Sequence, residues 1–576
     1  MPPRRPGPKD YLSLEKGGWK KKWKGKQPVA LVFPNHYQLG MSNLGFQLVY
    51  GLLNALPDIV CERIFLPEDN SQPLSIESGR PLRDFPLILC SVSFEDDFVS
   101  LVRIFRMGGI EPLAEVRYPE AINTQGFPLI IGGGVATFIN PEPLAPFIDF
   151  FVVGEAESIL PQLVSYLAEK ISLFDRGKLL ADIVQCFSGC YVPQFYNVDY
   201  LPDGTIGGIK AMAPAPDRVR KVVTYGSDAV GHSVILTPET EFADMFLAEL
   251  GRGCSRGCRF CAAGFVYRPP RLWSADAVIS SLHDRPANSR RVGLLGMEMA
   301  KPDDLAKIAK YLVAEGCLLS FSSLRADAFS DSLVELLSKS NLKSAAIAPD
   351  GGSERLRRVI NKGIVEDDVL RAAETLVQAG VTNLKMYFMI GLPTETMDDM
   401  LELVALVKKV QTVILVIGKA RGYLSNITIS VNSFVPKAWT PFQFHPFADL
   451  DTLKERIKFL RKELGHLPNM KIIADQPLRA YFQAVIARGD RRLGPALLSL
   501  VDSGKKWTYV FKEHGLSPEN YAMRPRTENE LFPWEIIDHG INRSYLWSEY
   551  QRALFAKSTP VCDTKKCRRC GVCNDK

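Results

Sequence analysis

The chain has 576 residues, of which 46% are hydrophobic and 23% charged, and its formal net charge is +6. This balance is that of an ordinary globular protein, and the length suits about three to four domains. There is no apolar run of about 18 residues and no apolar signal core behind the N-terminus, so we expect no membrane span and a cytoplasmic location.

Basic residues gather at both ends of the chain. Residues 1–28 form a basic tail that includes Lys20-Lys-Lys-Trp-Lys-Gly-Lys26, and Lys565, Lys566, Arg568 and Arg569 lie near the other end. Such ends are typical of solvated tails, and they also suit contact with RNA or another polyanion. Charge alone leaves both interpretations open.

Residues 29–170 alternate between apolar strands and helices. Short apolar runs predict strands at 29–33, 85–93, 127–135 and 147–155, and helical spacing predicts a helix at 45–56. The pattern is that of a doubly wound, Rossmann-like α/β domain, whose ligand crevice lies beyond the carboxyl ends of the strands. Ser91, Gly132 and Gly133 fall at such ends.

A connector rich in Pro, Gly and Asp follows at 171–240, and residues 241–440 again alternate between strands and helices. Six strands are expected at 246–250, 291–296, 318–324, 344–348, 383–390 and 428–434, with helices between them, for example at 302–315 and 330–337. This pattern predicts a partial (β/α)6 barrel of the TIM type, in which working residues lie at the carboxyl ends of the strands.

Cys254, Cys258 and Cys261 follow the first of these strands with the spacing C-x3-C-x2-C. Thiolates in one short loop suit a soft metal, and iron–sulfur clusters are held by cysteine thiolates. A [4Fe–4S] cluster held by three cysteines keeps one iron free for chemistry. A structural zinc site would need a fourth ligand nearby, and this remains the alternative.

With Phe260 before its last cysteine, this loop resembles the signature of the radical S-adenosylmethionine (SAM) superfamily. The resemblance implies an enzyme with a [4Fe–4S] cluster whose open iron is chelated by SAM. One electron from the cluster then cleaves SAM to a 5′-deoxyadenosyl radical. The resemblance also implies an external reductant such as flavodoxin or ferredoxin.

Motifs at later strand ends resemble the SAM-binding runs of the same superfamily. They lie at Gly296-Met-Glu298, at Pro349-Asp-Gly-Gly-Ser-Glu-Arg355 and at Gly391-Leu-Pro-Thr-Glu395. The resemblance implies SAM contacts from Gly296, Glu298, Ser353, Glu354, Arg355 and Gly391. Glu298 as a plain acid leading a helix, and Arg355 as one half of an ion pair across its helix, are the alternatives.

The run Pro34-Asn-His-Tyr-Gln-Leu-Gly40 is similar to the first loop of the cobalamin-binding domain fused ahead of many radical SAM enzymes. That domain's motif is D-x-H-x-x-G, and its histidine ligates cobalt. Aligned on Gly40, this chain has Asn35 at the aspartate position and Tyr37 at the histidine position. Either cobalamin binds here without a protein histidine, near Tyr37, Ser91, Gly132 and Gly133, or the domain has lost it.

The last part of the chain is expected to be a mainly helical domain at 441–558 and a cysteine tail at 559–576. Cys562, Cys567, Cys570 and Cys573 have the spacing C-x4-C-x2-C-x2-C, which suits zinc or a second iron–sulfur cluster. Unligated cysteines, or a zinc knuckle that binds RNA, are further alternatives.

Taken together, the motifs resemble a group of radical SAM proteins with a fused N-terminal cobalamin-binding-like domain. The resemblance implies abstraction of hydrogen from a C–H bond, with cobalamin-linked C-methylation as the leading outcome. A non-methylating radical SAM reaction, or modification of an RNA or protein with a degenerate cobalamin domain, is the alternative. The substrate, whether small molecule, protein or RNA, is not encoded in any motif.

Overall fold

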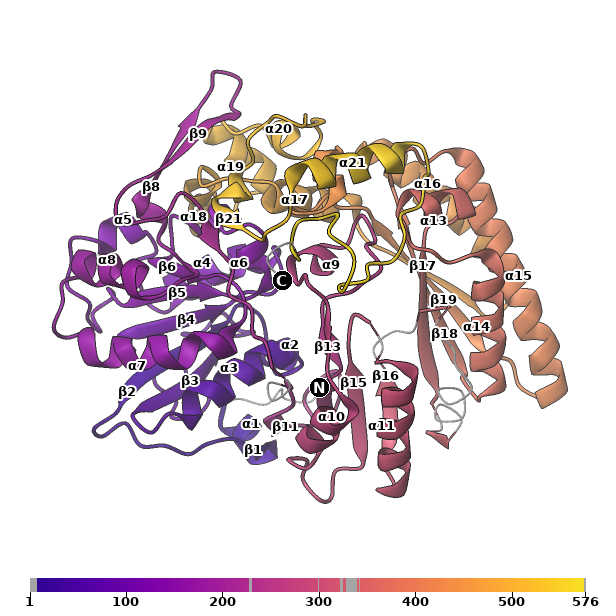
Figure 1. Ribbon diagram of the computed structural model, residues 1–576, viewed down its shortest axis with the longest axis horizontal. Helices are drawn as coiled ribbons and strands as arrows, with labels where there is room; N and C mark the ends of the chain where they lie inside the picture. Colours follow the sequence, from indigo (N-terminus) through magenta and orange to yellow (C-terminus); the bar gives the residue numbers. More distant parts are fainter. Residues whose placement is uncertain are drawn as a thin grey trace. The chain divides into compact units, whose positions relative to one another are not determined.

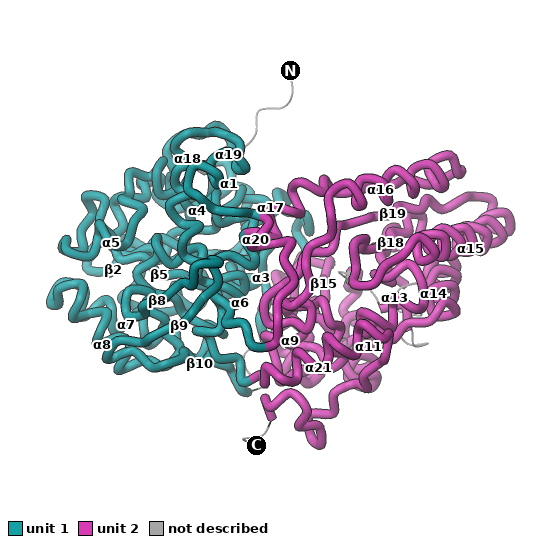
Figure 2. The backbone as a smooth tube through the Cα atoms, turned by 90° about the horizontal axis from the view of Figure 1, so that it is seen from above, with its two compact units in different colours: residues 1–245, 486–518, 529–540 teal, residues 246–485, 519–528, 541–576 magenta. Residues whose placement is uncertain are grey.

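A computed structural model describes residues 8–226, 230–298, 300–321, 325–327, 339–340 and 342–573. The chain forms two compact units, coloured separately in Figure 2. Unit 1 contains residues 1–245, 486–518 and 529–540, and unit 2 contains residues 246–485, 519–528 and 541–576. The expected helical region at 441–558 therefore contributes to both units.

A six-stranded sheet forms the centre of unit 1, with the strand order β3-β2-β4-β5-β6-β7 (Figure 1). The four expected strands are confirmed as β2 (Gln27–Phe33), β4 (Leu87–Ser91), β5 (Leu129–Gly133) and β6 (Phe150–Val152), all parallel. The sheet gains β3 (Ile59–Phe65), which is parallel, and the antiparallel edge strand β7 (Cys190–Tyr191).

Strand β3 was not predicted because Glu62 and Arg63 interrupt its apolar run, yet all seven of its residues are buried. The guanidinium of Arg63 pairs with Glu15 at 2.8 Å and with Glu77 at 2.6 Å. A charged side chain with carboxylate partners can be buried. The charged residues in this segment therefore did not indicate an exposed segment.

Helices cover both faces of this sheet, as expected for a doubly wound domain. One face packs against α3 (Leu44–Ala55), α7 (Leu160–Lys170) and α8 (Arg176–Cys186), whose apolar residues join those of β2 in one core. The buried side of α4 (Asp97–Met107) belongs to the opposite face and contacts α18 (Leu493–Ser503).

The N-terminal helix α1 (Pro8–Leu14) and the connector both add to unit 1. Strand β1 (Lys16–Gly17) pairs with β11 (Ile235–Leu236), and β8 (Tyr196–Tyr200) and β9 (Ile206–Ala211) form an antiparallel hairpin. Val222 lies alongside Gly154, where φ is 120° and an added Cβ would collide with the Val222 backbone. The connector thus runs along the carboxyl end of β6.

Unit 2 contains two parallel sheets, which together hold the six expected barrel strands. One has the order β12 (Phe246–Glu249), β15 (Arg291–Leu295), β16 (Leu318–Phe321). The other has the order β17 (Ser344–Asp350), β18 (Asn383–Ile390), β19 (Asn426–Ser433), β20 (Met470–Ala474). The last of these strands was not predicted, since the sequence around it was interpreted as helical.

Helices alternate with the strands of unit 2 (Figure 1). They include α10 (Ala275–Leu282), α11 (Pro302–Ala314), α13 (Glu354–Val359), α14 (Glu366–Gln378), α15 (Met397–Arg421) and α16 (Leu450–Leu464). The helix expected at 330–337 lies outside the described residues. The partial barrel of the TIM type is confirmed at the level of fold class.

The C-terminal part is largely helical, with α17 (Pro477–Ala487), α18, α19 (Trp507–Glu513), α20 (Pro518–Ala522) and α21 (Arg543–Leu554). A short strand, β21 (Ile537–Asp538), pairs with β10 (Val219–Arg220) of unit 1. Across the described part of the chain, no helix is long and apolar enough to cross a membrane.

Candidate functional site

The three motif cysteines lie on a loop between strand β13 (Gly251–Arg252) and the short helix α9 (Ala263–Val266). Cys254, Cys258 and Cys261 are each half-buried, and the Cys261 N–H donates to the Cys258 carbonyl at 3.1 Å. Gly253 turns the chain with a φ of 80°, where an added Cβ would lie 2.7 Å from the Tyr267 carbonyl oxygen. Backbone geometry therefore keeps the three thiols on one tight turn.

The environment of these thiols fits a group that binds thiolates. Burial raises the pKa of Cys254 to about 11 and that of Cys261 to about 12, so without a metal both are thiols at neutral pH. A bound metal stabilises the deprotonated form directly. Among the described residues, no three His, Cys, Asp or Glu side chains are placed to hold a single metal ion.

Arg259, inside the cysteine motif, fastens the loop to the rest of unit 2. Its side chain is fully buried and pairs with Glu549 of α21 at 3.1 Å. The guanidinium also donates to the carbonyls of Val359 at 2.9 Å and Lys557 at 2.7 Å, and to Thr559 Oγ1 at 3.1 Å. This residue, which lies between two of the motif cysteines, thus reaches both the end of α13 and the start of the tail.

Glu298 contacts the same loop at Ser255. The Ser255 N–H donates to Oε2 at 2.8 Å and its hydroxyl donates to Oε1 at 2.5 Å. Gly296 makes this turn possible, because an added Cβ would lie 2.8 Å from the Glu298 carbonyl oxygen. Glu298 therefore holds the loop beside Cys254, and its contact with SAM stays a prediction.

Charged residues surround the loop. Asp327 accepts from Arg325 at 2.8 Å and lies 3.3 Å from Arg256, and these cations hold the Asp327 pKa below its ordinary value although burial opposes the shift. Lys362 is buried, pairs with Asp350 at 2.5 Å, and places its ammonium 5.9 Å from the Phe260 ring centroid. The cations suit a cofactor with carboxylate or thiolate charge.

Ser353, Glu354 and Arg355 lie at the start of α13, just after the end of β17. Ser353 is buried; its Oγ caps the helix by accepting from the Leu356 N–H at 3.0 Å and donates to Asp399 at 2.5 Å. Arg355 also pairs with Asp399 and donates to the Thr394 carbonyl at 2.6 Å.

These contacts join the start of α13 to the loop after β18. The Glu354 carboxylate accepts from the Glu366 N–H at 3.0 Å, and Gly391 turns the end of β18 with a φ of 79°. The structure therefore shows positioning contacts for these residues, and their roles toward SAM stay predictions.

In unit 1, Tyr37 lies in the core rather than at an open ligand edge. Its ring stacks on Tyr11 at 3.8 Å, and its hydroxyl donates to Glu15 at 2.6 Å. Burial and Glu15 raise its pKa well above the ordinary value. The preceding His36 places Nδ1 3.0 Å from the Leu66 carbonyl oxygen. The Tyr37 phenol is thus committed to protein partners.

Ser91, Gly132 and Gly133 end their strands side by side, since β4 and β5 pair Cys90 with Gly132 and Ser91 with Gly133. Gly132 has no room for a Cβ beside the Phe151 ring, whereas a Cβ at Gly133 would meet only the Cys90 carbonyl oxygen at 3.9 Å. The sequence placed these three residues correctly at one sheet edge. Their contact with cobalamin stays a prediction.

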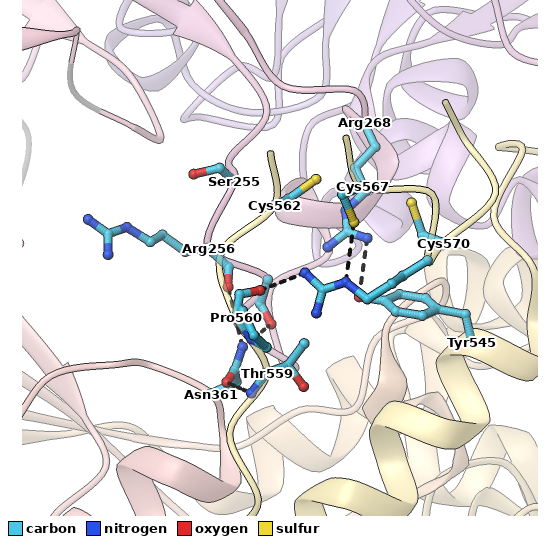
Figure 3. Close-up of a pocket in the computed structure, with 12 residues that line it drawn as sticks. Ser255, Arg256, Arg268, Asn361, Tyr545, Thr559, Pro560, Cys562, Cys567 and Cys570 are labelled. Carbon is cyan, nitrogen blue, oxygen red and sulfur yellow. Dashed lines mark hydrogen bonds between the residues drawn. The ribbon is translucent and has the colours of Figure 1, made fainter. Parts of the chain in front are cut away.

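The cysteine tail lies against the cysteine loop. The Cys562 N–H donates to the Ser255 carbonyl at 2.8 Å, and a small pocket is bordered by Ser255, Arg268, Tyr545, Cys562, Cys567 and Cys570 (Figure 3). Cys570 and Cys573 are buried, and Cys562 and Cys567 are half-buried.

Several residues of this region were missed by sequence reasoning, namely Arg259, Arg325, Asn361, Lys362 and Thr559. Asn361 donates to the carbonyls of Arg256 and Gly257 at 3.3 Å each, and accepts from the Thr559 N–H at 2.8 Å. Of these residues, Arg259 alone had a signal in the sequence, namely its position inside the cysteine motif. The other four reach the site only because the fold brings distant parts of the chain together.

Family models match two parts of this chain. The model described as "Radical SAM proteins, N-terminal" matches residues 45–193, and the model described as "Radical SAM superfamily" matches residues 248–407. The second match contains the three loop cysteines and all the predicted SAM-contacting residues.

A curated relative is an uncharacterised protein, MJ0966, from Methanocaldococcus jannaschii. It is 28% identical over 474 residues, which cover 81% of this chain and 90% of the relative. The N-terminal and core regions therefore occur together in a second protein of comparable extent.

Among solved structures, the chain is similar to the radical SAM methyltransferase TsrM from Kitasatospora setae, with cobalamin and a [4Fe–4S] cluster bound. The identity is 14%, the TM-score is 0.47, and the match covers 86% of this chain and 98% of TsrM. The cobalamin-dependent radical SAM enzyme OxsB is 13% identical at a TM-score of 0.46, covering 92% of this chain and 80% of OxsB.

Proposed function

We propose that this chain, an enzyme of the radical SAM superfamily, cleaves SAM at Cys254, Cys258 and Cys261 and uses the product to break a C–H bond of its substrate. The observation that carries the proposal is the tight loop of three half-buried thiols, within the region matched by the superfamily model. When bound there, a [4Fe–4S] cluster supplies one electron that splits SAM into methionine and a 5′-deoxyadenosyl radical.

The residues of the chain prepare this site in three ways. Glu298 and Arg259 hold the loop from opposite sides through Ser255 and Glu549, which keeps the thiols in one arrangement. Arg325 and Lys362, each paired with an aspartate, lie beside the thiols, where charge-assisted bonds to a substrate carboxylate are strong. Asp350, Ser353 and Arg355 shape the neighbouring strand end.

The test is SAM cleavage by anaerobically purified protein with a chemical reductant. Wild-type protein should form 5′-deoxyadenosine, and Cys258→Ala should lose it entirely, because two thiolates cannot hold the cluster. Cys186→Ala, which changes an exposed cysteine of unit 1, is the matched control and should keep wild-type rates. Unchanged deoxyadenosine formation by Cys258→Ala would refute the proposal.

Within this reaction class, the outcome we favour is cobalamin-linked C-methylation. It is supported by the doubly wound sheet, whose carboxyl edge carries Ser91 and Gly133, where an added Cβ on the glycine would make only one ordinary contact, with the Cys90 carbonyl oxygen. Tyr37 does not fit as a cobalt ligand, because its hydroxyl is donated to Glu15 within the core. Cobalamin would therefore bind here without the Tyr37 phenol as a cobalt ligand.

Cobalt analysis of the purified protein tests this outcome. We expect about one cobalt per chain after reconstitution with cobalamin, and we expect the same for Tyr37→Phe, which keeps the ring and removes only the hydroxyl. Protein that cleaves SAM but retains no cobalt would favour the alternative, a non-methylating reaction on a small molecule, protein or RNA. Altered nucleosides in RNA from a deletion strain would identify RNA as the substrate.

A further inference from the structure

The cysteine tail at 559–576 is bound to the loop that carries Cys254, Cys258 and Cys261. Thr559 is held by Arg259 and by Asn361, whose amide also donates to the Arg256 and Gly257 carbonyls. Three residues later, the Cys562 N–H donates to the Ser255 carbonyl at 2.8 Å. Buried side chains thus hold the tail in place at the position where its cysteines begin.

The tail itself is a folded turn rather than a loose end. The N–H groups of Lys566 and Cys567 donate to the Asp563 carbonyl at 3.1 Å and 2.7 Å, and the Asn542 N–H donates to the Cys570 carbonyl at 2.8 Å. The last contact joins the tail to the start of α21. These bonds bring Cys562, Cys567 and Cys570 to one pocket (Figure 3).

Positive charge surrounds these thiols. Arg569 Nε donates to Cys567 Sγ at 3.2 Å. Arg268 is buried beside the same pocket, with its guanidinium 4.3 Å from the Phe265 ring centroid. A metal held by thiolates is negative overall, and nearby cations stabilise that charge.

We propose that Cys562, Cys567, Cys570 and Cys573 hold a second iron–sulfur cluster, which passes electrons to the SAM-cleaving site across the Cys562–Ser255 contact. The C-x4-C-x2-C spacing of the first three cysteines is one that iron–sulfur proteins use. Electron transfer between two clusters requires that they lie close together, and the Cys562–Ser255 contact places the tail against the cysteine loop.

The electron balance is simple. A low-potential protein donor gives one electron to the proposed cluster of the cysteine tail. That cluster returns to its oxidised state when it passes the electron to the cluster of the cysteine loop. No bond forms or breaks at the tail. The inference rests on the proposed SAM cleavage only for the destination of the electron, and the tail site itself can be tested without it.

The first test is metal content and electron paramagnetic resonance of full-length protein purified anaerobically. One [4Fe–4S] cluster holds four irons, and wild-type protein should contain more iron than this per chain. Its resonance spectrum after reduction should show the signal of a second reduced cluster. Cys570→Ala should lose that excess iron and that signal, Cys258→Ala should keep both, and Cys186→Ala should match wild type. About four irons and one zinc per chain, or iron unchanged in Cys570→Ala, would overturn the inference.

The second test compares two reductants in the Cys570→Ala protein. With dithionite, which reaches the loop cluster directly, deoxyadenosine formation should stay within about twofold of wild type; with a flavodoxin system it should fall by about tenfold or more. Equal rates with flavodoxin would overturn the electron route. Loss of cleavage in wild type with both reductants would instead count against the proposed function, because the tail iron is measured independently.

Discussion

Arg259 shows how one side chain connects distant parts of unit 2. It is fully buried, and its partners come from α13, from α21 and from the residues that precede the cysteine tail. Burial opposes the charged form of an arginine, and Glu549 offsets this cost. Arg259 acts as a positioning residue, because its contacts are all with protein groups around the thiols.

Replacing Arg259 with Ala should destabilise the protein strongly. The change leaves the buried Glu549 carboxylate without this partner, so we expect a loss of about 3–5 kcal/mol in the free energy of unfolding. Chemical denaturation under anaerobic conditions measures it. The control is Arg358→Ala, which removes an exposed helix pair with Glu354 and should cost less than about 1 kcal/mol. Similar losses in both variants would contradict this role for Arg259.

Tyr37 is the residue at which the sequence pattern was least informative. The alignment on Gly40 located the position, but it could not identify Glu15, which lies 22 residues earlier and accepts the phenol hydrogen bond. The same carboxylate pairs with Arg63 of β3. A buried network of this kind depends on three segments that meet only in the folded chain.

At the scale of elements, the connector is held tightly to the central sheet of unit 1. Val222 exchanges backbone hydrogen bonds with the end of β6, donating to the Val153 carbonyl at 2.8 Å and accepting from the Glu155 N–H at 3.0 Å. Gly154 between them has a φ of 120°, and the Val222 backbone occupies the space where a Cβ would lie. This glycine is required by both its dihedral angle and its neighbour.

Gly154→Ala should therefore weaken the attachment of the connector. Backbone strain and the collision with Val222 together should cost about 2–5 kcal/mol. Gly79→Ala is the matched control, since Gly79 has a φ of 70° but nothing within 4 Å of its added Cβ, and it should cost about 1–2 kcal/mol. Thermal unfolding of both variants measures the difference. A smaller effect at Gly154 than at Gly79 would argue against the tight contact.

The strands of both units were largely predictable because buried parallel strands form continuous apolar runs. The four strands expected in unit 1 and the six expected in unit 2 are present. Two strands were missed for physical reasons. In β3, the charged residues Glu62 and Arg63 interrupt the apolar run although both are buried. In β20, residues Lys471–Ala474 alternate between exposed and partly buried positions at the edge of their sheet.

At the scale of the whole molecule, the C-terminal part of the chain contributes residues to both units. In unit 1, Arg491 pairs with the buried Glu142 at 2.8 Å, and Asn140 donates to the Gly489 carbonyl at 2.9 Å. Helix α18 packs on α4. Unit 1 is therefore completed by residues 486–518 and 529–540, which begin 241 positions after its first segment ends at residue 245.

A fragment of residues 1–245 expressed alone should be less stable than the same fragment coexpressed with a second fragment of residues 486–540. The fragment alone leaves Glu142 without Arg491 and exposes apolar surface of α4. We expect the segment to copurify with the fragment and to raise its melting temperature by about 5 °C or more, measured by circular dichroism. The same segment with Arg491→Ala should bind more weakly. Failure of the segment to associate would contradict the observed division of units.

The sequence by itself determined the positions and spacing of the two cysteine groups, the order of the strand-end motifs and the class of fold. These depend on local spacing and apolar periodicity, which short stretches carry in full. The tertiary structure decided that the cysteine tail lies on the cysteine loop, that Arg259 is buried between them, and that Tyr37 is committed to Glu15. Each of these depends on partners distant in the chain, and burial and hydrogen bonding select such partners only when the whole chain has folded.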